Sequence, residues 1–118
     1  MTASEARAIV VMDTAAGTYP QITNSDVDAI LLRCRVVDSA GRIISDPDWV
    51  GTYDLNLACA LVFEAKASRV ADQVDFSRDG ASFRASQRAE GFMQRAKEYR
   101  KRRAAGFGFE PDVPEVPS

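Results

Sequence analysis

The sequence predicts an all-α protein: a small helical bundle of about four helices, with a long loop between the second and third helices and an extended C-terminal arm. Apolar residues recur at spacings of three and four along several segments, which is the period of one helix face. Turn-forming residues separate these segments, and three prolines in the last eight residues exclude a helix there. A chain of 118 residues is long enough for one domain with one core. We therefore expect a helical domain over residues 1–105 and a proline-rich arm over residues 106–118.

The first two helices are expected before residue 38. Residues 3–15 are rich in alanine and other apolar residues, and a glycine and a proline follow them. The second helix is predicted to begin at Ser25, because its hydroxyl and the acidic residues Asp26 and Asp28 can satisfy exposed amide groups. It should run to about Val37. Its predicted buried face consists of Val27, Ile30, Leu31, Cys34 and Val37.

Residues 38–53 are predicted to form a long loop. Turn chemistry surrounds Gly41 and Pro47, and the apolar residues in the loop are scattered. A loop of this length in a compact domain is either functional or packed down by its own side chains. Trp49, the single tryptophan, is the candidate for pinning the loop, and contact with a partner is the alternative. The expected anchors are Ile43, Ile44, Trp49 and Val50.

The third helix should begin near Thr52 or Asp54 and run to about Val74. Its first half, residues 55–63, is apolar on nearly every side, whereas its second half gains polar positions such as Lys66. A helix that is apolar all round must be covered all round. It is therefore a central core helix, or part of its surface meets a neighbouring subunit, and the two interpretations are compatible. The candidate subunit-interface residues are Leu57, Leu61 and Phe63.

A turn centred on Gly80 is predicted before the last helix, with Ser82 or Ser86 as its cap. The last helix carries a narrow apolar seam and a strongly basic surface, with basic residues concentrated towards its C-terminal end. The seam consists of Ala85, Ala89, Phe92, Met93, Ala96 and Tyr99. The basic residues are Arg88, Arg95, Lys97, Arg100, Lys101, Arg102 and Arg103.

Charge is segregated along the chain, although the net charge is only -2. Residues 1–60 hold four basic and eight acidic residues, residues 61–105 hold eleven basic and six acidic residues, and the tail adds three acidic residues. Separated charge suits head-to-tail contact between copies, with an acidic surface against a basic one. A solvated basic helix is the simpler alternative.

Catalytic chemistry finds little support in the sequence. The chain has no histidine, which removes Ser-His and Cys-His mechanisms and the commonest imidazole ligand. Cys34 and Cys59 lack a CxxC partner and are predicted to be small buried thiols. The aspartate pairs at residues 26 and 28 and at 46 and 48 lie at a helix start and in a turn, where structural roles suffice. We expect no enzyme activity, no cofactor and no metal.

Membrane and nucleic-acid partners are also not indicated by composition. The longest apolar stretch, residues 55–63, is about half of a membrane span, and no basic segment precedes an apolar run at the N-terminus. We therefore expect no membrane association and no export by the usual route. A pI of about 5.1 argues against a dedicated nucleic-acid binder. The basic last helix nevertheless keeps a small helical nucleic-acid-binding or regulatory protein as the alternative.

The region 46–103 resembles the small head-tail adaptor, or head completion, proteins of tailed bacteriophages and prophages. The similar pieces are the loop 46–50 leading into 52–58, the alanine-rich helix ending at 66–71, and the turn 74–83 before a charged helix. None of these is a chemical motif. The resemblance rests on their order and spacing.

The resemblance implies a structural virion protein made in the host cytoplasm and located at the head-tail interface. Its copies would form a ring, expected to be dodecameric, between the portal and the stopper or tail protein. DNA would pass through the lumen without specific binding. The C-terminal helix and arm would engage the portal, which makes Arg102, Arg103, Phe107 and Phe109 portal-docking candidates. Loops on the opposite side would meet the next ring, which makes Trp49 the stopper-contact candidate.

Overall fold

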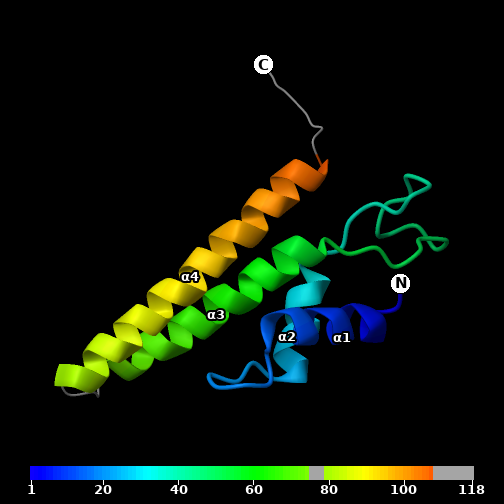
Figure 1. Ribbon diagram of the computed structural model, residues 1–118. Coiled ribbons are helices and arrows are strands. Elements are labelled where there is room, and N and C mark those ends of the chain that lie inside the picture. Colours follow the sequence, from blue (N-terminus) through cyan, green and yellow to red (C-terminus); the bar gives the residue numbers. More distant parts are fainter. Residues whose placement is uncertain (75–78, 108–118) are drawn as a thin grey trace.

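The computed structural model describes residues 1–74 and 79–107, with side chains at positions 1–71 and 86–102. Four helices form in these residues: α1 (Ala3–Thr14), α2 (Asn24–Leu32), α3 (Leu55–Val74) and α4 (Asp79–Phe107). Helices α3 and α4 lie side by side as a long antiparallel hairpin, and α1 and α2 pack across the first half of α3 (Figure 1). The only extended pairing in the described residues is a single antiparallel bridge between Arg35 and Tyr53. The predicted all-α bundle is therefore confirmed.

Helix α1 begins and ends as local sequence chemistry dictates. The Thr2 hydroxyl accepts the Glu5 N–H at 3.1 Å, and the Glu5 carboxylate accepts the Thr2 N–H at 2.8 Å. This capping box satisfies two amides that the helix itself leaves without partners. The helix ends before Ala15, which adopts the left-handed conformation with a φ of 51°. Ala6 and Val10 are the fully buried residues of this helix, and the predicted first helix is confirmed.

Helix α2 differs from the prediction at both ends. Its cap is Thr23 and not Ser25, because Thr23 and Asp26 form a second capping box with bonds of 3.2 and 3.3 Å. It ends at Leu32 and not at Val37, because the chain beyond it pairs with the segment before α3. The Val36 N–H donates to the Thr52 carbonyl, and the Asp54 N–H donates to the Cys34 carbonyl.

The predicted buried face of α2 is confirmed except at its last member. Val27, Ile30, Leu31 and Cys34 are all at most 5% exposed. Val37 is 55% exposed, since it lies beyond the true end of the helix. The three-and-four spacing therefore identifies the buried positions as far as Cys34, two residues beyond the end of α2, and fails at Val37.

Helix α3 begins where the sequence predicts. The Asp54 carboxylate accepts the Leu57 N–H at 3.0 Å and caps the helix. Two separate core clusters then cover its apolar surface. Ala58, Cys59 and Val62 pack against α1 and α2, whereas Ala60 and Phe63 pack against α4. Much of the apolar surface that called for a neighbouring subunit is thus covered within the chain.

Helix α4 begins at Asp79, so the predicted turn at Gly80 and the predicted caps at Ser82 and Ser86 are wrong. Its seam against α3 is confirmed for three of its residues. Met93 is 41% exposed and does not belong to the seam, and the Ala85 side chain lies outside the described residues. The confirmed seam residues are Phe92, Ala96 and Tyr99, and Ala89 is partly buried. The helix extends to Phe107, two residues into the predicted arm, and residues 108–118 lie outside the described residues.

Candidate functional site

The loop between α2 and α3 is organised around Asp38, whose side chain is only 1% exposed. Its carboxylate accepts the backbone N–H groups of Ala40, Arg42 and Val50 at 2.8 to 3.0 Å, and the Nε of Arg42 at 2.8 Å. The bond from the Val50 N–H, with help from the Arg42 guanidinium, holds the pKa of Asp38 well below its usual range. One buried carboxylate thus joins both ends of the loop.

Trp49 pins the loop a second time. Its indole Nε1–H donates to the Val36 carbonyl at 2.9 Å, and its ring packs edge-on against Tyr53 with centroids 6.1 Å apart. The ring is half-buried. The loop-pinning interpretation of Trp49 is therefore confirmed, and its contact with a stopper stays a prediction.

Outward from these anchors, the loop exposes apolar and acidic side chains. Val37, Ile43, Ile44 and Val50 are 39 to 59% exposed, so the expectation that Ile43, Ile44 and Val50 anchor the loop is wrong. The polar contacts of Asp38 and of the Trp49 indole hold the loop in place instead. No cation among the described residues lies within ion-pair distance of Asp46 or Asp48. We call the set formed by Val37, Ile43, Ile44, Asp46, Asp48 and Val50 the acidic-apolar loop.

Replacing Asp38 by asparagine is expected to loosen the loop, because the neutral amide loses the ion pair with Arg42 and offers one acceptor oxygen. We expect Trp49 emission to shift to longer wavelength and the Tm to fall by several degrees. Because the folded-state pKa is lowered from 3.8, this stabilisation is present above pH 4 to 5 and is lost as pH falls further. The emission of the single tryptophan reports both effects. Asp13→Asn is the control, and an Asp38→Asn variant with wild-type emission and Tm would contradict the assignment.

A row of three arginines runs along α4 at intervals of seven residues: Arg88, Arg95 and Arg102. Seven residues are close to two helical turns, so the three side chains lie on one side of the helix, and all three residues are exposed. Each guanidinium lies over an aromatic ring, which orders the side chain and leaves its N–H edges open. The rings are Tyr19 at 5.7 Å, Phe63 at 5.8 Å and Tyr99 at 4.6 Å. No described carboxylate lies within ion-pair distance of this arginine row.

Lys66 is a buried cation within the hairpin. It is 1% exposed, and its ammonium donates to the carbonyls of Thr18 and Pro20 at 3.0 and 3.2 Å. The ammonium also lies 5.6 Å from the centre of the Phe92 ring. Burial, with the nearby charge of Arg95, lowers the pKa of Lys66. The sequence identifies Lys66 only as a polar position of the helix, and the structure shows that it ties the loop between α1 and α2 to the hairpin.

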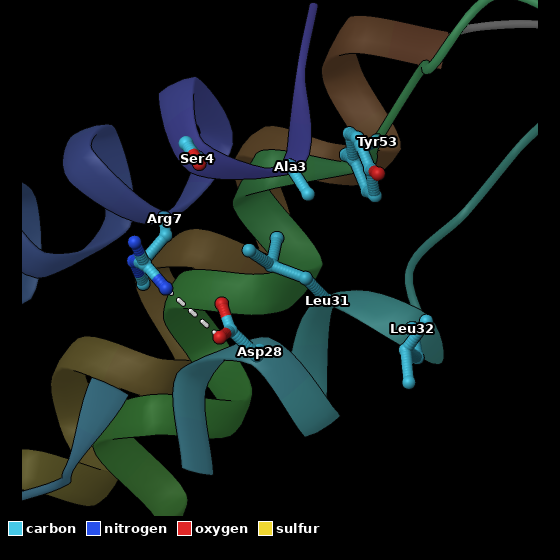
Figure 2. Close-up of a pocket in the computed structure, with 7 residues that line it drawn as sticks. All are labelled: Ala3, Ser4, Arg7, Asp28, Leu31, Leu32 and Tyr53. Atoms are coloured by element: carbon cyan, nitrogen blue, oxygen red, sulfur yellow. Dashed lines mark hydrogen bonds and ion pairs between the residues drawn. The ribbon is translucent and has the colours of Figure 1, made fainter. Parts of the chain in front are cut away.

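A half-open pocket of about 260 Å³ lies between α1, α2 and the segment before α3. Figure 2 shows that its two charged residues, Arg7 and Asp28, point towards each other, and they form an ion pair at 2.9 Å. The two opposite charges satisfy each other, and the rest of the lining is small, apolar or hydroxyl-bearing. The remaining lining residues are Ala3, Ser4, Leu31, Leu32 and Tyr53. The ion pair joins α1 to α2, which makes the pocket a structural feature.

Cys34 and Cys59 are both 1% exposed, which confirms that they are buried thiols. Burial raises the pKa of Cys59 to about 12, so its sulfur is protonated at neutral pH. Among the described residues, no group of three or more acidic or cysteine side chains could hold a metal ion. The groups with unusual pKa values therefore hold the fold together and do not converge on one cavity.

The subunit-interface candidates occupy different positions. Phe63 is 4% exposed and stacks with Phe92 and Tyr99 inside the hairpin, so it is not on the surface that a neighbouring subunit could contact. Its apolar neighbours in sequence suggested a partner, but α4 is that partner. Leu57 and Leu61 are partly buried against the core and keep some exposed surface.

The portal-docking candidates lie at the C-terminal end of α4. Arg102 is exposed there. Arg103 and Phe107 belong to the last turns of the helix, but their side chains lie outside the described residues, as does the whole of Phe109. Because α3 and α4 are antiparallel, this end of α4 and the acidic-apolar loop lie towards the same end of the hairpin (Figure 1). The resemblance implied opposite sides for the portal and stopper contacts.

Comparison with known proteins adds no relative: no family model, curated protein or solved structure matches the chain. The fold defines the class, a small all-α protein built on a long helical hairpin. Within the described part of the chain, no helix combines the length and apolar character that crossing a bilayer requires.

Proposed function

We propose that this chain is a structural subunit that binds other protein surfaces, and that it serves as the head-tail adaptor of a tailed bacteriophage. The acidic-apolar loop supports the first part of this proposal, the binding of other protein surfaces. The acidic-apolar loop is fixed from within by Asp38 and Trp49, yet it exposes four aliphatic side chains. Exposed apolar side chains gathered on one segment are a mark of interaction sites, and a pre-ordered loop loses little entropy on binding.

The adaptor assignment rests on the resemblance of residues 46–103 to that family. The same residues contain the acidic-apolar loop's second half and the hairpin of α3 and α4. In the proposed role, the copies form a dodecameric ring on the portal, DNA passes through the lumen, and a stopper or tail protein docks below. No cofactor takes part.

The placement of the loop changes one assignment within this role. The portal contact is kept at the end of α4, through Arg103, Phe107 and Phe109, and Arg102 is left to the arginine row. The loop lies towards that same end, so it is poorly placed to reach a ring on the opposite side. We therefore assign the acidic-apolar loop to contact between copies, and a stopper contact by Trp49 becomes the alternative.

Position in the genome and co-purification test this proposal. The gene should lie just downstream of portal and capsid genes, and the chain should co-purify with the portal protein encoded there. A chain that ends at Gly106 should retain its helical content and bind the portal at least about tenfold more weakly, because two candidate anchors are removed. A portal from an unrelated phage is the control. A full chain that binds no portal contradicts the adaptor role, and a truncated chain that binds normally contradicts the assigned anchors.

The arginine row favours a second candidate, a small nucleic-acid-binding protein. Ordered guanidinium groups can neutralise phosphates and release counterions. The acidic pI of about 5.1 opposes this function for the chain as a whole. Binding of the full chain to random duplex DNA at low salt separates the two candidates, since tight binding with a steep salt dependence would favour the second.

A further inference from the structure

We propose that the acidic-apolar loop of one copy binds the arginine row of a neighbouring copy. This inference rests on the proposed function as an assembling subunit and identifies the surfaces that meet. It joins two features that lie on different parts of the same chain: the loop before α3 and one side of α4.

The two surfaces are complementary in charge. Asp48 is exposed, its neighbour Asp46 is partly exposed, and neither has an ion-pair partner among the described residues. The arginine row likewise presents three guanidinium groups that have no ion-pair partner among the described residues. By contrast, Arg100, on the same helix, is paired with Glu64 at 2.8 Å. The two surfaces therefore carry opposite charges that no described residue pairs. This complementarity favours the encounter of two copies and fixes its register.

Both surfaces also carry exposed apolar or aromatic side chains. The loop offers Ile43 at 59% and Val50 at 51% exposure. Beside the row, the ring of Tyr19 is 58% exposed and that of Tyr99 is partly exposed. Arginine and tyrosine are enriched at the energetic centres of protein interfaces, because they combine large contact area with directed hydrogen bonds. Both sides are thus amphipathic and not merely charged.

Both surfaces are ordered before they meet. Asp38 and Trp49 hold the loop, and the aromatic rings hold the arginines, so little side-chain freedom remains to be lost on association. Because the contact joins two different surfaces, it is heterologous. A pair of copies therefore keeps one acidic-apolar loop and one arginine row free. Further copies can add until a ring closes.

Charge reversal tests the contact on the isolated full chain. Sedimentation velocity up to about 1 mM at low salt should show wild-type species larger than a dimer that dissociate as salt rises. Asp48→Lys alone and Arg95→Glu alone should each weaken this association by more than about tenfold. An equimolar mixture of the two variants should recover association, because each reversed charge then meets its opposite. A wild-type chain that stays monomeric, or a mixture that recovers nothing, would overturn the proposal.

Matched controls carry the same charge changes elsewhere. Lys97→Glu lies on the other flank of α4, and Asp13→Lys lies on α1, so both should associate as the wild type does. Thermal melting shows whether each variant folds. If Arg95→Glu does not fold, Arg95→Gln is used in its place. Loss of duplex DNA binding in Arg95→Glu, with no effect of Asp48→Lys on self-association, would overturn the proposal in favour of a phosphate ligand.

The portal-binding experiment distinguishes failure of the adaptor role from failure of the contact between copies. If copies associate through these surfaces and bind no portal, the contact stands and the adaptor role falls. If Asp48→Lys and Arg95→Glu both form normal rings on a portal, the adaptor role stands and this contact falls.

Discussion

Replacing Phe63 by alanine is expected to lower the free energy of unfolding by about 3–5 kcal/mol. The ring is 4% exposed and stacks with Phe92 and Tyr99 at centroid distances of 6.3 and 5.8 Å. Together with Ala60 and Ala96 it forms the cluster that joins α3 to α4. Truncation would leave a cavity in that cluster, which the hairpin can fill only in part. Because small domains are stable by roughly 5–15 kcal/mol, this single change would remove a large share of the total.

Urea denaturation followed by circular dichroism measures this effect. Met12→Ala is the matched control, since Met12 is a large apolar side chain that is 81% exposed. It should change stability by no more than about 0.5 kcal/mol. A Phe63→Ala variant with the urea midpoint of the wild type would show that the hairpin cluster does not hold the fold together.

Replacing Lys66 by methionine is expected to destabilise the chain by about 1–3 kcal/mol. Methionine can follow the path of the aliphatic stem, so packing is largely kept. The carbonyls of Thr18 and Pro20 lose their donor, and the Pro20 residue is buried, whereas Thr18 is exposed. A buried carbonyl without a donor costs stability, and we expect this cost to exceed the gain from removing a buried charge.

The same urea experiment tests Lys66, with Lys97→Met as the control because Lys97 is exposed on α4. The control should be nearly neutral. A Lys66→Met variant as stable as the wild type would mean that relief of the buried charge outweighs the two hydrogen bonds.

Local chemistry made the starts of α1 and α3 predictable. Thr2 with Glu5 and Asp54 with Leu57 act within three residues, so the determinants are visible in the sequence. The spacing of apolar residues also identified the faces that α2 and α4 bury. These features need no knowledge of what packs against them.

Long-range contacts account for several features that sequence reasoning missed, whereas the Thr23 cap of α2 is local and was missed because Ser25 stands beside it. The end of α2 is set by pairing of residues 34–36 with 52–54, and Lys66 is buried by carbonyls 46 and 48 residues away. Asp38 could be read as a turn residue, but its bond to Val50, twelve residues away, makes it the centre of the loop. The interval of seven in the arginine row is visible in the sequence, whereas its aromatic partners Tyr19 and Phe63 come from other elements.

Imaging is the most direct test of the proposal that this chain functions by assembling on a partner. Electron microscopy of the full chain mixed with the portal encoded beside its gene should show an added ring of about twelve copies, coaxial with the portal channel. Portal particles without an added ring, at chain concentrations well above those of the portal, would contradict the claim.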